Sequence, residues 1–224
     1  MRTLYHWPLD PGSRQVRIVL TEKSIETSLE VVQPWRDTHL VELNPSGLTP
    51  VLVTGEASSQ SIIAETRPIL EYLEEINKDP ALMPGDSVDR AEIRRICAWF
   101  DRKFDNEVNA YLLHEKLEKR VQSLGAPDMD AIRTGKDFLK WHLDYLSGLL
   151  MDRDGLAGPR YTLADIAAAA HLSCLDYFGD VPWDDFQPVR TWYERIKCRP
   201  SFRGPLQDRL PGIPPVSWYS ELDF

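Results

Sequence analysis

Glu65 and Thr66 stand where a helix is predicted to begin, and the pair has residue types that suit a charged ligand. The helix is expected over residues 67–75, with Pro68 in its first turn, where a missing N–H costs no helical hydrogen bond. The unpaired amides of a first turn favour an anion, and a Thr hydroxyl beside them can add a hydrogen bond. The alternative is that Thr66 only caps the helix, a role it would fill equally well.

Other polar groups in the sequence point to structure and not to chemistry. Thr162 and Asp165 form a Thr-x-x-Asp capping box ahead of an alanine-rich helix, and such a cap is worth about 1 kcal/mol of stability. Cys97, Cys174 and Cys198 are odd in number and far apart, without the spacing of metal ligands. We interpret all three as core thiols in a reducing compartment, and we predict no metal site.

Composition excludes several classes of partner. The 224 residues carry a formal net charge of -9 with a sequence pI near 5.1, which argues against a nucleic-acid or anionic-membrane surface because phosphate binding needs a clustered basic field. The first twenty residues lack the pattern of a secretory signal, and no run of about eighteen apolar residues predicts membrane insertion. We therefore expect a cytoplasmic protein.

The first third of the chain alternates strand and helix patterns. Strands are predicted at residues 3–7, 28–32 and 50–53, with a hairpin partner at 57–63. Helices are predicted at residues 13–23 and 65–76 from apolar residues at helical spacing. Their order, βαβ and then ββα, would bring the segment around Thr49 and Pro50 and the start of the second helix into one small α/β domain.

The rest of the chain has helical periodicity. Helices are predicted at 88–117, 128–150, 162–177 and 188–197. We expect an α/β domain at 1–78, a linker at 79–86, an all-α domain at 87–210 and a proline-rich aromatic tail at 211–224.

Four segments together resemble the glutathione S-transferase superfamily. They are Leu4-Tyr5 through Arg17-Ile18, the run from Asn44 to Leu52, Glu65-Thr66 through Tyr72-Leu73, and Thr162 to Ile166. Each is weak alone, but their order and spacing span residues 3 to 203 and end in the turn Arg199-Pro200-Ser201-Phe202. The resemblance implies a thioredoxin-like amino-terminal domain, an all-α carboxy-terminal domain and glutathione as co-substrate.

The resemblance also implies roles for particular residues. Pro50 would follow a cis bond, and Thr49 would then present its backbone N–H and C=O to the cysteine of glutathione. Glu65 would take the ammonium of the γ-glutamyl group, and Thr66 would take its carboxylate. Trp35, in the polar stretch before the turn, is predicted to share in substrate binding.

Asp10 departs from the pattern of the family. Members similar to the theta, phi and tau classes keep a Ser at this position, which donates a hydrogen bond to the glutathione sulfur. An ionised carboxylate only accepts hydrogen bonds and would repel a thiolate, raising the pKa of the thiol. Ser13, His6 and Tyr5 are the alternative donors that the resemblance suggests; otherwise Ser13 is a helix N-cap, His6 a solvent-facing strand residue and Tyr5 part of the core.

Both ends of the chain are similar to a narrower group, the FtsZ-localised glutathione S-transferase-like division proteins of alphaproteobacteria. The start Arg2–Pro11 and the end Leu222-Asp223-Phe224 carry this similarity. It implies a homodimer that binds FtsZ filaments and has dispensable glutathione chemistry. The aromatic residues of the tail need a surface on which to be buried. We predict that a partner is contacted by Trp218 and Tyr219, together with Glu221 and Trp35. The alternative is that the tail covers its own helical domain.

Two functions remain open from the sequence. In the first, which we favour because of Asp10, the protein is a dimeric FtsZ-binding regulator of cell division. In the second, it is an active transferase that conjugates glutathione to a small hydrophobic electrophile or reduces that electrophile. Both imply a homodimer, because the family joins two subunits.

Overall fold

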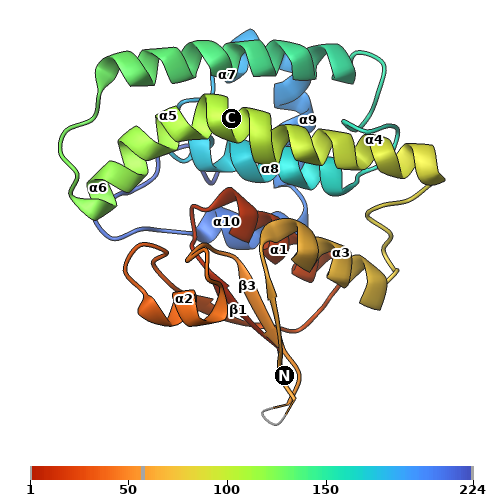
Figure 1. The fold of residues 1–224 in the computed structure, drawn as a ribbon. Coiled ribbons are helices and arrows are strands. Elements are labelled where there is room, and N and C mark those ends of the chain that lie inside the picture. Colours follow the sequence, from red (N-terminus) through yellow and green to blue (C-terminus); the bar gives the residue numbers. More distant parts are fainter. Residues whose placement is uncertain (1, 57–58, 223–224) are drawn as a thin grey trace. The chain divides into compact units, whose positions relative to one another are not determined.

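Four short strands form one mixed sheet (Figure 1). The strands β1 (Arg2–His6), β2 (Ser28–Val31), β3 (Val51–Thr54) and β4 (Ser61–Ala64) lie in the order β2-β1-β3-β4. β1 pairs in parallel with β2 and antiparallel with β3, which pairs antiparallel with β4. The computed structural model describes residues 2–56 and 59–222, so Ala57, where the hairpin strand was predicted to begin, lies outside the described residues. The thioredoxin-like arrangement is confirmed.

The central strand β1 directs successive side chains to opposite faces of the sheet, and helices pack near both faces. Helices α1 (Pro11–Glu22) and α3 (Thr66–Ile76) pack against each other. Leu4 and His6 of β1 are buried, while Tyr5 between them packs on the other face against a cluster that includes Leu40 of α2 (Thr38–Leu43). The sequence analysis did not predict α2, because a six-residue helix is too short to show a helical period.

The helical unit is built from three long helical segments and several short ones. Its elements are α4 (Ser87–Ala98), η1 (Trp99–Asn109), α5 (Ala110–Leu113), η2 (His114–Glu118), α6 (Lys119–Gln122), α7 (Met129–Leu150), α8 (Leu163–Asp176), η3 (Trp183–Asp185) and α9 (Gln187–Lys197). The segments from α4 to α6 follow one another directly, with wider π-type turns in η1 and η2. The single helix predicted at 88–117 is therefore longer than expected.

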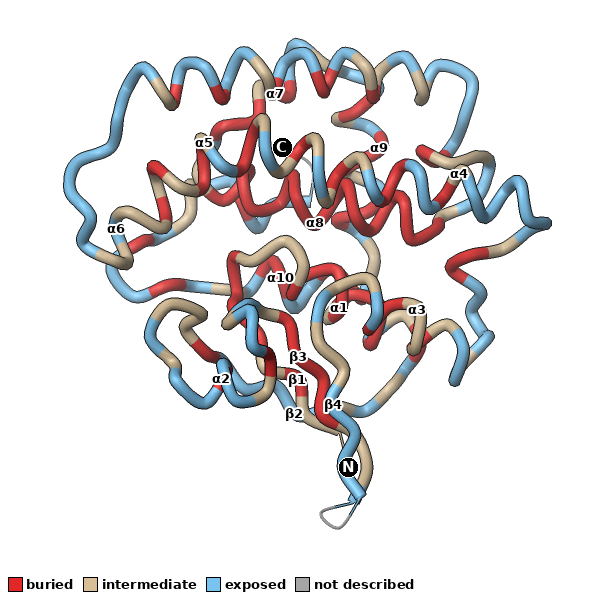
Figure 2. The backbone as a smooth tube through the Cα atoms, in the orientation of Figure 1, coloured by how far each residue is buried: buried red, intermediate tan, exposed pale blue. Residues whose placement is uncertain are grey.

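Helix α8 is the centre of this unit. Figure 2 shows it buried along its whole length, and every residue from Leu163 to Asp176 is buried. The predicted capping box is confirmed: Thr162 caps the helix, and Asp165 accepts from the Thr162 backbone N–H over 2.9 Å. Asp165 also accepts from the Leu156 amide and from the Trp192 indole, so it joins three segments of the unit.

Contacts divide the chain into two units. One unit is Met1–Ala81 with Pro200–Ile213, and the other is Leu82–Arg199 with Pro214–Phe224. The segment that joins the sheet unit contains η4 (Pro200–Phe202) and α10 (Arg203–Gln207). This segment packs with the sheet unit because Asp208 forms ion pairs with Arg14 and Arg17 of α1. The helical periodicity of the sequence could not reveal these ion pairs.

Two of the three cysteines are core thiols, as predicted. Cys97 and Cys174 are buried, but Cys198 is exposed. The prediction was wrong for Cys198 because this residue ends α9 at its C-cap and turns away from the core. No cluster of His, Cys, Asp or Glu with the arrangement of metal ligands occurs within residues 2–56 and 59–222. Over the same described ranges, no helix combines the length and apolar character that crossing a lipid bilayer requires.

Candidate functional site

Asp10 is the N-cap of α1 and receives four hydrogen bonds. The Gly12 and Ser13 amides donate to its carboxylate over 3.1 and 2.9 Å. The hydroxyls of Ser13 and Thr49 donate to the same carboxylate oxygen, Oδ2, over 2.6 and 2.9 Å. Burial raises the pKa of the Asp10 carboxyl, while these hydrogen bonds favour its ionised form. These four donor groups thus all point at the Asp10 carboxyl group.

The Ser13 hydroxyl is fully engaged. It accepts a hydrogen bond from the Trp7 amide over 3.2 Å and gives its one proton to Asp10. A hydroxyl has a single donor, so in this arrangement Ser13 has none left for a thiolate. The structure also places Asp10, not Ser13, at the N-cap that the sequence analysis considered for Ser13.

His6 and Tyr5 are poorly placed as replacement donors. The alternative that His6 faces solvent was wrong, because its side chain is buried on the α1 face of the sheet. Burial lowers the pKa of His6 to about 4, and Arg17 adds to the effect, so the imidazole is neutral at pH 7. Tyr5 packs in the cluster on the opposite face, edge-on to His39, as its core alternative predicts.

Thr49, Pro50 and Thr66 lie close to the start of α1. The Thr49–Pro50 bond is cis, as the resemblance implied. A Cβ atom on Gly12 would lie 2.3 Å from the Thr66 Oγ1 and 3.3 Å from the Pro50 Cδ, so only glycine fits where these segments meet. The structure therefore brings together Asp10, the pair Thr49 and Pro50, and Thr66, which come from three separate parts of the sequence.

Glu65 has an unusual backbone at the first residue before α3. Its φ of 73° lies in the left-handed region, which costs a non-glycine residue free energy and often marks a functional position. Its exposed side chain accepts hydrogen bonds from the Asn44 amide over 3.1 Å and from the Ser46 hydroxyl over 2.9 Å. Asn44 and Ser46 were recognised in the sequence only as turn residues, although they fix this carboxylate.

Trp35 lies beside the first strand of the site. It is partly buried, and its ring is edge-on to Trp7 with the centroids 5.5 Å apart. Within the described part of the chain, its indole N–H has no acceptor. Trp35 lies next to Trp7, and the Trp7 amide donates a hydrogen bond to Ser13. Trp35 is therefore linked to the site through Trp7.

Sequence reasoning missed a group of charges beneath α1. Arg14 is completely buried and donates to the Pro8 carbonyl over 2.8 Å and to Asp208 over 3.2 Å. Arg17 binds both oxygens of Asp208 over 2.9 Å each. This pairing of α1 with a residue nearly two hundred positions later leaves no local pattern in the sequence, and it fixes the helix that begins at Asp10.

The carboxy-terminal tail packs on the helical unit. Tyr219 is completely buried, with its ring 5.1 Å from that of Tyr177, and the Val216 amide donates to the Tyr177 carbonyl over 3.0 Å. Trp218 and Glu221 remain exposed. They border a pocket of about 490 Å³ with the segment 181–185. Phe224, also named in the predicted tail, lies outside the described residues.

Comparisons with known proteins agree with this geometry. Residues 11–76 match the family described as glutathione S-transferase, N-terminal domain. FtsZ-localized protein A of Caulobacter vibrioides is 54% identical over 224 residues, covering 100% of this chain and 98% of that protein. The solved structure of FzlA from C. crescentus has a TM-score of 0.98 and 54% identity, covering 100% of this chain and 99% of that one. A glutathione S-transferase from Rhodospirillum rubrum has a TM-score of 0.95 and 46% identity, with full coverage of both chains. The chain belongs to the glutathione S-transferase family.

Proposed function

We propose that this protein binds FtsZ filaments as a homodimer and regulates cell division in the cytoplasm, with a thiol-activating site that has lost its function. The observation that carries the proposal is the pair Ser13 and Asp10, because the Ser13 hydroxyl donates its proton to the Asp10 carboxylate. The similarity over the whole chain to an FtsZ-localized protein supports the choice of partner.

Glutathione chemistry is weak or lost in this proposal. A thiolate next to Asp10 would meet a second negative charge, and the Ser13 and Thr49 hydroxyls that could steady it already bind that charge. Residual binding of glutathione is supported by the cis bond between Thr49 and Pro50 and by the position of Glu65 and Thr66 at the start of α3. We therefore expect at most weak binding of glutathione without turnover of a hydrophobic electrophile.

The tail contributes a surface for a protein partner, and Trp35 of the sheet unit is a separate candidate contact. Trp218 is 44% exposed, and Glu221 beside it adds a negative charge to the rim of a pocket that Asp184 and Asp185 also line. An exposed aromatic next to carboxylates is suited to a protein partner with complementary basic groups. Tyr219 takes part indirectly, because its buried ring holds the tail on the helical unit.

Co-sedimentation with FtsZ polymers assembled with GTP tests the proposal. The wild type should pellet with the polymers, and Trp218→Ala and Glu221→Lys should each reduce the pelleted fraction at least fivefold. Met151→Ala and Asp152→Lys are matched controls, because they change an exposed apolar and an exposed acidic residue of the same unit outside the tail. A wild type that remains in the supernatant contradicts the proposal, and so does steady turnover of glutathione with common electrophiles.

A further inference from the structure

Strand β2 is an edge of the sheet with an unoccupied outer side. Among the described residues, β2 pairs only with β1. The Val32 amide donates a hydrogen bond to the His6 carbonyl. Because backbone groups alternate in direction along a strand, Ser28, Glu30 and Val32 turn their N–H and C=O groups toward β1. The N–H and C=O of Leu29 and Val31 consequently point away from the sheet, where an added strand would bind them.

The side chains at this edge are apolar and exposed. Leu29 is 48% exposed and Val31 is 59% exposed. Their register with Leu4 and His6 places them on the face of the sheet that α1 covers. Natural edges are usually protected by charge, proline or a covering segment. Here two branched side chains lie on the α1 face, next to the open backbone groups.

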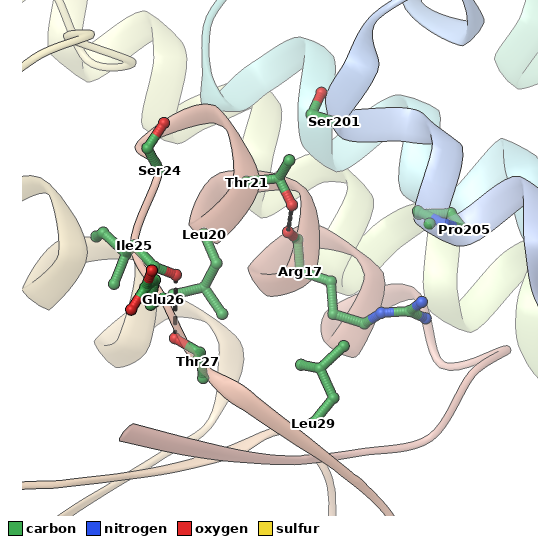
Figure 3. Close-up of a pocket in the computed structure, with 11 residues that line it drawn as sticks. Arg17, Leu20, Thr21, Ser24, Ile25, Glu26, Thr27, Leu29, Ser201 and Pro205 are labelled. Carbon is green, nitrogen blue, oxygen red and sulfur yellow. Dashed lines mark hydrogen bonds between the residues drawn. The ribbon is translucent and has the colours of Figure 1, made fainter. Parts of the chain in front are cut away.

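A pocket of about 480 Å³ adjoins this edge (Figure 3). Its apolar wall is formed by Leu20 of α1, Ile25, Leu29 of β2 and Pro205 of α10, all in the sheet unit. Figure 3 shows the Leu29 side chain between the strand and the Arg17 side chain. An extended segment paired with β2 would direct alternate side chains into this pocket, because side chains of neighbouring strands share a face.

Several donor groups that line the pocket are already bonded within the chain. The hydroxyls of Thr21 and Thr27 donate to the Arg17 and Ile25 carbonyls, and the Ser201 hydroxyl donates to Glu22. The Arg17 guanidinium donates two hydrogen bonds to the Asp208 carboxylate.

Carboxylates at this edge add negative charge. Glu26 lines the pocket, and Glu30 of β2 lies on the opposite face of the sheet because it pairs with Tyr5. In the described part of the chain, neither carboxylate has an ion pair. What the edge offers is therefore apolar surface, hydroxyl oxygens and negative charge.

We propose that the outer edge of β2 and its pocket bind an extended basic segment of another protein by strand addition. The backbone of that segment pairs with Leu29 and Val31. An Arg or Lys on it lies along Leu29 and places its charged group near Glu26, since long basic side chains cover apolar surface while their charge meets acceptors. A second copy of this chain fits less well, because its own edge would bring the same carboxylates.

Binding of a designed peptide tests this surface without FtsZ. The probe is a nine-residue acetylated peptide of alternating valine and threonine with one central arginine, titrated into the isotope-labelled full chain and followed by amide NMR shifts. The shifts should be confined to β2 and the lining of the pocket. The same peptide with a central glutamate should bind at least tenfold more weakly, and added salt should weaken the arginine peptide.

Substitutions of the two sheet edges provide the control. Leu29→Lys should weaken binding at least tenfold, and Val31→Pro should do the same by removing an outward N–H that the ladder with β1 does not use. Ile62→Lys changes an apolar residue of similar exposure, 49%, on the opposite edge strand β4 and should leave binding within twofold. Unchanged amide spectra away from β2 show that each variant is folded.

Several results would overturn the inference. The first three are NMR shifts elsewhere on the chain, equal binding of the arginine and glutamate peptides, and equal effects of Leu29→Lys and Ile62→Lys on binding. The fourth is self-association of the protein that Leu29→Lys abolishes, which would mean that a second copy covers the edge. None of these results bears on FtsZ binding, because the probe contains no FtsZ sequence, so the two proposals fail separately.

Discussion

The Ser13 hydroxyl donates its proton to the Asp10 carboxylate across 2.6 Å, so this hydroxyl is already engaged at the start of α1. A serine that would otherwise be free to donate to a sulfur anion is turned inward, and the carboxylate that holds it repels the same anion. The Thr49 hydroxyl, from the segment before β3, is bound in the same way.

Replacement of Asp10 should restore affinity for glutathione. Asp10→Ser removes the charge, keeps a residue that can cap α1 and releases the Ser13 and Thr49 hydroxyls, so we expect glutathione to bind about tenfold more tightly, a gain of about 1.4 kcal/mol. Isothermal calorimetry of the wild type and the variant measures this. Asp86→Ser is the matched control, because Asp86 also caps a helix through two backbone amides but lies in the helical unit. Equal affinities of wild type and Asp10→Ser would show that the charge is not what silences the site.

The buried His6 should make stability depend on pH. Its pKa is about 4 in the folded protein and near 6.5 when unfolded, so between these values the unfolded chain takes up a proton that the folded chain refuses. Stability is therefore complete above pH 6.5 and falls as the pH drops toward 4, by roughly 3 kcal/mol for this residue. Urea unfolding across this range should show the fall. His6→Leu should reduce its size, whereas His39→Leu, an exposed histidine of α2, should leave it unchanged.

Asp165 should matter more to stability than an ordinary helix cap. Asp165→Ala would leave the Leu156 and Thr162 amides and the Trp192 indole without their buried acceptor, and each lost partner costs about 1 kcal/mol or more. We expect a loss of at least about 3 kcal/mol in the free energy of unfolding. Asp89→Ala is the control, because Asp89 belongs to the capping box of α4 but is exposed. Similar losses in both variants would mean that Asp165 acts only as a cap.

Neighbouring tail residues should separate stability from binding. Tyr219→Ala removes a completely buried ring that packs on Tyr177 and should lower the free energy of unfolding by about 3 kcal/mol or more. Trp218→Ala, one residue away and 44% exposed, should cost under about 1 kcal/mol. Thermal and urea unfolding of both variants checks this. A larger loss from Trp218→Ala would show that the indole packs on its own chain and not on a partner.

Patterns along the sequence determined the order of elements and most of the candidate site. Apolar spacing is local, so it predicted α1, α3, α7, α8 and α9, and the box at Thr162 and Asp165 predicted where α8 begins. The short helix α2 escaped because six residues hold too little periodicity. Asp10, Thr49, Pro50, Glu65 and Thr66 were identified because their segments resemble the motifs of the family.

Only the tertiary structure decided where the protons and charges of those residues go. The bonds from Ser13 and Thr49 to Asp10, the capture of Glu65 by Asn44 and Ser46, and the pairing of Arg14 and Arg17 with Asp208 join positions that the chain brings together by folding. Burial likewise set His6 inside the sheet unit and Tyr219 inside the helical unit. A sequence specifies which groups are present, but a hydrogen bond depends on distance and direction in space, and solvation depends on what covers each group.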